Sequence, residues 1–287
     1  MKVSVIIPTY NEEKVIVECL ESLSEQTYKD LPAGKAGMET IVIDDGSTDS
    51  TLSVLNTIHY SQFTIHLLRQ KHLGPGEARN LGAKHARGEI LVFVDADMTF
   101  DKDFIRDLVA PIINGDSKGT FSKNEFVSNI DNGWSLCWGI NQGWEKGKRH
   151  PKDYPNTQKV FRAILKSEFD SAEGFDIGGH YTDDWSLSKK LGYEATVAPG
   201  AKFYHVNPDT LGEVFNQSKW AAKREYKLGW LGKLVVLGRT SLPISLITGV
   251  VKSLIYIRPQ FLIFKLVYDF AALIGILEYI LTGRGFK

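Results

Sequence analysis

Two aspartates separated by a single residue, Asp95 and Asp97, follow directly after the largely apolar segment Glu89–Val94. Carboxylates at this spacing can reach one divalent cation. Hard cations such as Mg²⁺ and Mn²⁺ take oxygen ligands and commonly bridge to substrate phosphates. Short acidic triplets also occur by chance in polar turns. The pair alone is therefore compatible with a cation site and with an ordinary turn at the end of a strand.

Two further polar clusters carry groups that can bind a nucleotide. Asp44 and Asp45 begin the segment 44–49, and their carboxylates can accept hydrogen bonds from a base or a ribose. Asp, Ser and Thr are also the usual residues of capped turns, so both interpretations stay open. Arg79 stands near the start of a helix predicted from Gly74 to Arg87, where its guanidinium can contact a base or phosphate or lie on the surface.

The elements that must position these groups alternate between strands and helices. Asn11 is expected to cap the first helix, and Lys102–Ile113 is expected to be another. This alternation predicts an α/β fold with a parallel sheet and helices on both faces, in which ligands bind at the carboxyl ends of the strands. The polar clusters follow three of those ends. The predicted strands are Val3–Ile7, Thr40–Ile43, Phe63–Leu68 and Glu89–Val94.

The order of the motifs resembles the nucleotide-binding half of a family 2 glycosyltransferase with the GT-A fold. The similarity covers residues 3–110 closely and resumes over 161–191, where 173–176 and 182–187 resemble acceptor-side motifs of that family. The motifs that carry it are Pro8-Thr9-Tyr10-Asn11-Glu12, Asp44-Asp45-Gly46-Ser47, Ala78-Arg79-Asn80 and Asp95-Ala96-Asp97.

This resemblance implies a role for individual residues. Asp97 and His205 would hold a Mn²⁺ or Mg²⁺ ion, the cofactor. Asp184 would be the catalytic base, although Asp183 stands where Glu is common, so either carboxylate is a candidate and both are also typical of a helix N-terminus. The residues expected to bind the nucleotide sugar are Pro8, Thr9, Tyr10, Glu12, Asp44, Asp45, Arg79 and Asp95.

The charge of the chain is unevenly distributed. The 34 basic and 34 acidic residues cancel, which argues against a nucleic-acid partner. Residues 219–287, however, hold eleven basic and three acidic residues, a net charge of +8, so residues 1–218 carry −8. Two cysteines and the lack of a signal-peptide core at the N-terminus favour a reducing, cytoplasmic setting.

The basic tail contains two long apolar stretches, Ser241–Ile257 and Phe261–Leu281, separated by Arg258-Pro259. The second is long enough to span a membrane, but Lys265 and Asp269 lie inside it. A membrane hairpin, helices lying in the interface and helices packed in a soluble core all remain possible, and the flanking cations favour anionic lipid in the first two. We expect membrane lipid to be a partner of residues 241–281.

The expected organisation is a GT-A domain over residues 1–218 and a basic, hydrophobic helical tail over 219–287. Within the domain, 1–110 would bind the nucleotide sugar and 111–218 the acceptor. Residues 114–160 show no period and are interpreted as a variable segment facing substrate. Their tryptophans, Trp134, Trp138 and Trp144, could stack on a sugar, meet the membrane or anchor the core.

The predicted function is that of an inverting, metal-dependent glycosyltransferase at the cytoplasmic face of the cell membrane. Its substrates would be a nucleotide-diphosphate sugar and a glycan or lipid-linked acceptor. One alternative is a non-catalytic nucleotide-sugar-binding membrane scaffold. Another, less favoured, is a sugar-phosphate nucleotidylyltransferase, which needs a Gly-rich, basic phosphate loop after the first strand, where this chain has Pro8-Thr9-Tyr10-Asn11 instead.

Overall fold

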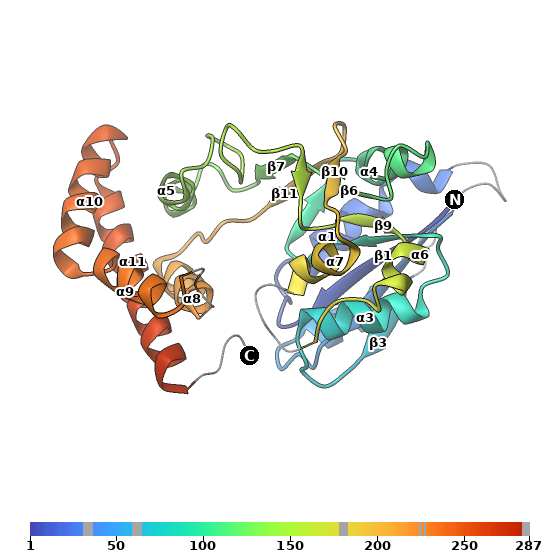
Figure 1. Ribbon diagram of the computed structural model, residues 1–287, viewed down its shortest axis with the longest axis horizontal. Coiled ribbons are helices and arrows are strands. Elements are labelled where there is room, and N and C mark those ends of the chain that lie inside the picture. The colour runs from blue at the N-terminus through green and yellow to red at the C-terminus, as the bar shows by residue number, and fades with distance from the viewer. Residues whose placement is uncertain (31–36, 59–64, 178–182, 224–225, 227, 283–287) are drawn as a thin grey trace. The chain divides into compact units, whose positions relative to one another are not determined.

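The computed structural model describes residues 1–30, 37–58, 65–177, 183–223, 226 and 228–282 of the 287-residue chain (Figure 1). Two compact units share these residues. Unit 1 comprises residues 1–126 and 153–205, and unit 2 comprises residues 127–152 and 206–287. The chain therefore leaves the first unit once, returns to it and leaves again. The domain boundary at residue 218 remains a prediction.

Unit 1 is built on an eight-stranded sheet, within the described residues, in the order β3-β2-β1-β4-β9-β6-β10-β8. The first four strands are parallel, and β9 then runs antiparallel to both of its neighbours. The predicted α/β class with a mostly parallel sheet is confirmed. The strands are β1 (Lys2–Thr9), β2 (Gly37–Asp44), β3 (Ile65–Arg69), β4 (Ile90–Phe93), β6 (Gly119–Phe121), β8 (Thr157–Gln158), β9 (Ala163–Leu165) and β10 (Ala195–Val197).

Alternation along β1 explains how both faces of this sheet are covered. Val3, Val5 and Ile7 belong to one buried cluster, with side chains from α1, α2 and α4, whereas Ile6 belongs to a second cluster with α3, α6 and α7. Successive side chains of a strand point to opposite faces, so a strand covered on both sides reads as a continuous apolar run. These helices are α1 (Ile16–Ser24), α2 (Thr51–Thr57), α3 (Pro75–His85), α4 (Phe104–Ile113), α6 (Lys166–Ser171) and α7 (Asp183–Leu191), and a 3₁₀ turn covers Thr27–Asp30.

A second, three-stranded sheet has the order β5-β11-β7, formed by β5 (Met98–Phe100), β11 (Lys202–His205) and β7 (Asn124–Val127). In the antiparallel register of β5 and β11, His205 lies opposite Met98 and Phe203 opposite Phe100. Phe104 contacts both phenylalanines, with ring centroids 4.7 Å from Phe100 and 5.7 Å from Phe203. This small sheet brings the end of β11 beside the segment that follows β4.

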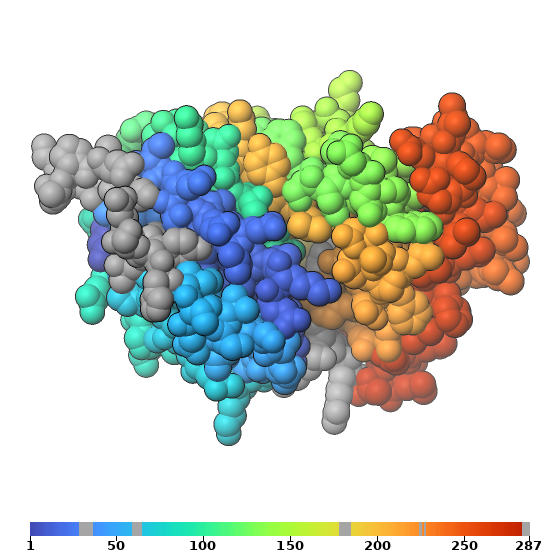
Figure 2. Space-filling view, turned by 180° about the vertical axis from the view of Figure 1, so that it is seen from behind, coloured from blue at the N-terminus to red at the C-terminus, as the bar shows by residue number. Residues whose placement is uncertain are grey.

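Unit 2 is helical. Its helices are α5 (Gly133–Gln142), α8 (Leu211–Ala222), α9 (Gly229–Arg239), α10 (Leu242–Ile255) and α11 (Gln260–Thr282). The two apolar stretches of the tail are thus α10 and α11, with the break at Arg258-Pro259 where it was expected. Figure 2 shows the green atoms of segment 127–152 beside the orange and red atoms of the C-terminal helices of the same unit.

The tryptophans of segment 127–152 belong to the core of this unit. Trp138 is buried, and its ring makes edge-to-face contacts with Phe264 and Tyr268 of α11. Trp134 and Trp144 pack partly buried against the same cluster. Among the alternatives for these side chains, the structure supports the packing role for all three.

Candidate active site

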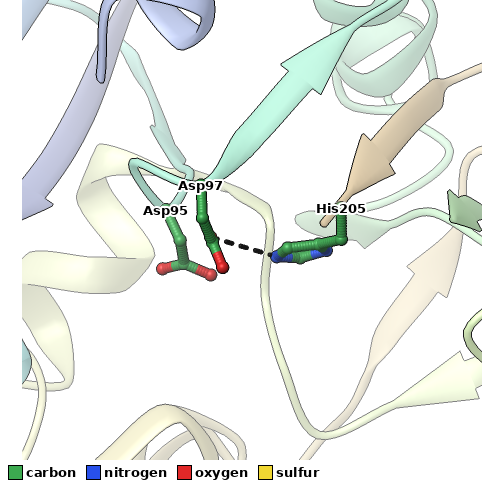
Figure 3. A group of neighbouring side chains, drawn as sticks. All are labelled: Asp95, Asp97 and His205. Atoms are coloured by element: carbon green, nitrogen blue, oxygen red, sulfur yellow. Dashed lines mark ion pairs between the residues drawn. The ribbon is translucent and has the colours of Figure 1, made fainter. Parts of the chain in front are cut away.

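The two aspartates of the Asp-Ala-Asp motif lie in a tight turn between β4 and β5. Met98 N donates to Asp95 O at 3.3 Å, which closes the turn over four residues. The turn follows the carboxyl end of a central strand, as expected for a ligand site in an α/β sheet. The Asp95 and Asp97 side chains therefore project from neighbouring points of one turn (Figure 3).

Asp95 is held by two arginines from different parts of the fold. Arg79 Nη2 of α3 donates to Asp95 Oδ1 at 2.7 Å, and Arg162 Nη1, just before β9, donates to Asp95 Oδ2 at 3.1 Å. Burial alone would raise the pKa of this carboxyl group. Arg162 and Arg79, with a smaller contribution from His205, outweigh burial and hold the pKa well below its usual range. Asp95 is thus a fixed negative charge.

His205 completes the cluster from the end of β11. Its Nε2 lies 3.3 Å from Asp97 Oδ1, and its Nδ1 lies 2.6 Å from Glu125 Oε1 of β7. A carboxylate behind one imidazole nitrogen fixes the ring and leaves the other nitrogen facing the site, the usual arrangement behind metal-bound histidines. Glu125 is therefore a positioning residue for His205.

The donor set fits a divalent cation. Asp95, Asp97 and His205 each offer one ligand atom, and these atoms all lie within 4.8 Å of one another. A ring proton on Nδ1 of His205, beside the Glu125 carboxylate, would leave Nε2 as an acceptor facing Asp97 Oδ1, and a cation between them would satisfy both. Because both oxygens of Asp95 already face arginines, Asp97 and His205 are the better-placed ligands. Oxygen and imidazole ligands suit Mn²⁺-type ions.

Asp45 is buried at the end of β2 and organises the loop before α3. Its Oδ1 accepts from Gln70 Nε2 at 2.6 Å and Leu73 N at 2.9 Å. Its Oδ2 lies 2.8 Å from His72 Nδ1 and accepts from Gly74 N at 2.9 Å. The carboxylate predicted to contact the nucleotide thus has four protein contacts of its own.

The loop that Asp45 holds brings an aromatic pair together. The rings of His72 and Tyr10 stack with centroids 3.9 Å apart, and Tyr10 is 39% exposed. Gly46 makes the approach of this loop possible, since its φ is +79° and a Cβ there would lie 2.9 Å from His72 N. An exposed, flat aromatic surface at a strand end is suited to a nucleotide base.

The remaining residues of the first two motifs mainly brace the strand ends. Asp44 is fully buried, accepts from Ser47 N at 3.1 Å and pairs with Arg69 at 3.2 Å. Pro8 and Thr9 are the last two residues of β1, and Thr9 O accepts from Asp45 N at 2.8 Å. These contacts fix the edge of the sheet, and a direct nucleotide contact by these residues stays a prediction.

Asn11 does not cap the first helix, contrary to expectation. Helix α1 begins at Ile16, and Val15 precedes it without a side-chain cap. Asn11 instead has a φ of +58° and accepts from Thr48 N at 2.8 Å. Asparagine tolerates this left-handed backbone, and here its amide ties the end of β1 to the loop after β2.

Glu12 lies half-buried on the acidic side of the site. Burial, followed by the charges of Asp97, Asp95 and Asp49, raises its pKa to about 8. Burial is the larger cause of the raised pKa, and the contribution of the three carboxylates marks a place where negative charge has accumulated. A bound cation would relieve that accumulation.

The predicted acceptor side is only partly described. Asn80, next to Arg79, clamps Phe175 by donating to its carbonyl at 3.0 Å and accepting from its amide at 2.9 Å. Asp183 and Asp184 are the first residues of α7, but their side chains lie outside the described part of the structure. The role of either residue as the base stays a prediction. Thr182, the first residue of the predicted acceptor-side motif 182–187, lies outside the described residues.

Arg162 and Glu125 belong to the site and were missed by sequence reasoning. Arg162 stands in the stretch 161–191 but outside the two motifs that carry its resemblance, and Glu125 stands in the aperiodic segment 114–160. Each reaches the Asp-Ala-Asp turn through a strand pairing distant in sequence, β9 with β4 and β7 with β11. Neither has a local motif that could have revealed it.

Comparison with known proteins identifies the family of the chain. The family model for glycosyl transferase family 2 matches residues 4–167. The Staphylococcus aureus poly(ribitol-phosphate) β-N-acetylglucosaminyltransferase TarS is 41% identical over 111 residues, which are 38% of this chain and 18% of TarS. The chain thus matches well under two thirds of the length of this curated relative.

Solved structures share the fold. TarS 1-349 in complex with UDP-GlcNAc has a TM-score of 0.56 and 22% identity, covering 77% of this chain and 66% of that one. The mannosyltransferase PcManGT from Pyrobaculum calidifontis, in complex with GDP-Man and Mn²⁺, has a TM-score of 0.59 and 20% identity, covering 98% of this chain and 87% of that one. Fold and strand-end site together define a GT-A nucleotide-sugar-transferase class. The chain belongs to glycosyl transferase family 2.

Proposed function

We propose that this chain is an inverting, metal-dependent glycosyltransferase that moves a sugar from a nucleotide-diphosphate donor to a glycan or lipid-linked acceptor at the cytoplasmic face of a membrane. The observation that carries the proposal is the cluster of Asp95, Asp97 and His205 at a strand end, with two arginines beside it. Acidic ligands for a cation and basic groups for phosphate at one edge of a sheet match the charges of such a donor.

The donor is proposed at the level of its class. TarS is named as an N-acetylglucosaminyltransferase and its structure holds UDP-GlcNAc, whereas PcManGT holds GDP-Man and Mn²⁺. The two differ in base and sugar and share a nucleoside diphosphate. In this chain the exposed face of Tyr10, backed by His72, would receive the base.

The chain's own groups would act on the diphosphate. Arg79 and Arg162 bring two positive charges to the end of β4, and Asp95 fixes the position of both. Asp97 and His205 would hold the cation, which when bound would stabilise the growing negative charge of the diphosphate leaving group. Glu125 would keep the imidazole in the orientation needed for that binding.

The acceptor hydroxyl needs a base on the face of the sugar opposite the leaving group. Asp184, or its neighbour Asp183, would take that proton from the start of α7. One base and one direct displacement give inversion at the anomeric carbon. Holding the 173–176 segment through Asn80 would help to fix the acceptor side relative to Arg79.

The test compares Asp184→Asn with Asp183→Asn in the full chain. Donor binding is measured as a thermal shift with UDP-, GDP- and dTDP-sugars in the presence of Mn²⁺, because a ligand of the folded state raises its stability. Transfer is measured with the donor that binds. We expect the variant lacking the base to keep the thermal shift and lose about 10³-fold in turnover. Normal turnover by both variants would place the base elsewhere.

A non-catalytic nucleotide-sugar scaffold makes the opposite prediction for the same assay. Such a protein would show the thermal shift but neither transfer nor slow hydrolysis of any nucleotide sugar, with or without Mn²⁺. Hydrolysis that requires Mn²⁺ and disappears in Asp97→Ala would support the enzyme. Hydrolysis is a useful readout because it needs no knowledge of the acceptor.

A further inference from the structure

The longest apolar helix among the described residues packs on one side against other helices of unit 2. Helix α11 is long and apolar enough to cross a membrane, with a mean hydropathy of 1.8 over its best window. Its charged residues are nevertheless paired inside the unit. Asp269 Oδ1 accepts from Lys265 Nζ at 2.8 Å, and Asp269 Oδ2 accepts from Ser245 Oγ of α10 at 2.6 Å.

Other helices pack on one side of α11 near both of its ends, although Ile263, Phe270 and Leu277 on its other side are exposed. Near its start, Phe261 and Phe264 share a buried cluster with Val214 of α8 and Trp138 of α5. Near its end, Glu278 pairs with Lys219 at 2.5 Å and Lys223 at 2.6 Å, both of α8. If α11 crossed a bilayer, these polar partners would enter hydrocarbon with it, at a cost of several kcal/mol for each unsatisfied group.

The densest run of exposed apolar residues lies on α10 and the two residues after it. Ten large apolar residues between Leu242 and Ile257 are exposed, and Leu254 is 75% exposed. Lys252 is the one charged residue of α10, and it turns inward, donating to the Ile140 carbonyl at 3.0 Å. Fourteen residues of helix measure about 21 Å, which is shorter than the ~30 Å hydrocarbon core. This helix is therefore too short to span but presents an uncharged outer face.

The surroundings of α10 are typical of a helix in a membrane interface. Exposed arginines, Arg239 and Arg258, lie just before and just after it, and exposed aromatic residues, Trp230 and Tyr256, lie nearby. The stretch 226–268 holds six basic residues and no acidic one. Interfacial helices combine a buried apolar face with flanking cations and aromatic rings. A second copy of the same face would instead bring like charges together.

We propose that α10, with the preceding α9, lies flat in the surface of an anionic membrane, and that α11 stays inside unit 2 and does not cross. The bend of 60° between α9 and α10 allows both to follow one surface. This inference rests on the proposed function only in that it gives the membrane-side enzyme its attachment. Its test contains no nucleotide sugar, so either can fail without the other.

The first experiment is flotation of the full chain with vesicles of phosphatidylcholine, alone or mixed with phosphatidylglycerol. We expect floating with the anionic vesicles, weaker at high salt because screening reduces the attraction of surface charges. Ile247→Glu with Leu254→Glu should lower binding about tenfold or more. Ile113→Glu, an exposed isoleucine of unit 1, is the matched control and should bind like the wild type.

A second variant protects the test against loss of folding. Arg239→Glu with Arg258→Glu changes exposed residues on either side of α10, the first of them the last residue of α9, and should reduce binding to anionic vesicles while the far-ultraviolet circular dichroism stays unchanged. Wild-type binding by both double variants would overturn the proposal. So would failure of the wild type to float, or its recovery as a dimer whose formation depends on Ile247 and Leu254.

The position of α11 is tested by labelling from one side. Pro259→Cys and Thr282→Cys place thiols just before α11 and at its last residue, in a chain whose own cysteines are buried. Protein bound to the outside of sealed vesicles is treated with a membrane-impermeant maleimide. We expect both positions to react before detergent is added. Protection of one position until detergent is added would show that α11 crosses, and would overturn the proposal.

Discussion

Asp95 in unit 1 and Asp269 in unit 2 are both paired with basic side chains, yet the two pairings have opposite effects on the charge at the protein surface. Asp95 faces Arg79 and Arg162, its side chain keeps 32% of its surface exposed, and Asp97 beside it is more open still. Asp269 faces Lys265 and Ser245 and keeps only 3%. The first pairing keeps charge available at a surface, and the second removes charge from one.

The difference shows why the neutral total of the chain carries little information. In unit 1, burial and, after it, the neighbouring carboxylates raise the pKa of Glu12 to about 8. In unit 2, the acidic groups of α11 are cancelled internally, so that the outer face of α10 is apolar and its margins are basic. With the proposed function and membrane attachment, the charge of unit 1 would meet a cation and a nucleotide, and that of unit 2 would permit contact with lipid.

The largest expected effect is the loss of Asp97. Asp97→Ala should lower transfer about 10³-fold and abolish Mn²⁺ binding measured by calorimetry, because the better-placed carboxylate ligand is gone. The melting temperature without metal should not fall. Asp116→Ala, an exposed aspartate far from the turn in sequence, is the control. Retained Mn²⁺ binding by Asp97→Ala would remove this carboxylate from the proposed site.

Breaking the ion pair between Lys265 and Asp269 in unit 2 should give the second-largest effect. Asp269→Leu leaves Lys265 buried without its partner and should cost about 3 kcal/mol of unfolding free energy in urea. Changing both residues, Asp269→Leu with Lys265→Met, should recover most of that loss, because an apolar pair needs no charge compensation. If the double variant is as unstable as the single one, the loss of stability does not come from the unpaired charge of Lys265.

Arg162→Met removes one partner of Asp95 in unit 1. It should cost about 2 kcal/mol of unfolding free energy near neutral pH. A lowered carboxyl pKa stabilises the folded state above the ordinary pKa of Asp, and this contribution is lost as the pH falls through the folded pKa. The difference between variant and wild type in urea unfolding should therefore shrink from pH 7 to pH 3. Arg106→Met, which removes an exposed ion-paired arginine, should show little change at either pH.

Glu12→Gln should give the smallest effect, and it should raise the free energy of unfolding where Asp269→Leu and Arg162→Met lower it. A raised carboxyl pKa means that ionisation destabilises the metal-free folded state as the pH rises from about 4.5 to about 8. The variant should therefore be more stable than the wild type by about 1 kcal/mol above pH 8 and equal to it near pH 4. Glu18→Gln, an exposed residue of α1, should show no such difference. A pH-independent gain would mean that crowding of charge is not its cause.

The sequence was a good guide where strand and site are adjacent in the chain. The runs that became β1, β2 and β4 end at the clusters that follow them, so their polar residues had to meet at one edge of the sheet. Predicted strand Phe63–Leu68 became β3, although its first two residues lie outside the described part. The apolar stretches of the tail, broken by Pro259, became α10 and α11.

Local patterns could not reveal contacts made across the fold. Glu125 reaches His205 only because β7 joins β11, and Arg162 reaches Asp95 only because β9 runs antiparallel beside β4. Asn11 has the sequence signature of a helix cap, but its side chain accepts a hydrogen bond from Thr48 N in the loop after β2 instead. The inward turn of Lys252 and the pairing of Asp269 also depend on helices distant in sequence.

The pairing of β11 with β5 determines which substitutions away from the metal cluster should lower activity. His205 faces Asp97 because it lies opposite Met98, and a slip of one residue would turn its ring to the other side of the ladder. Phe100, Phe104 and Phe203 hold that alignment, and the Phe203 ring also packs edge-to-face against the His205 ring, with centroids 5.8 Å apart. A genetic screen for lost activity would therefore return these phenylalanines, and excess manganese would rescue them better than it rescues Asp97.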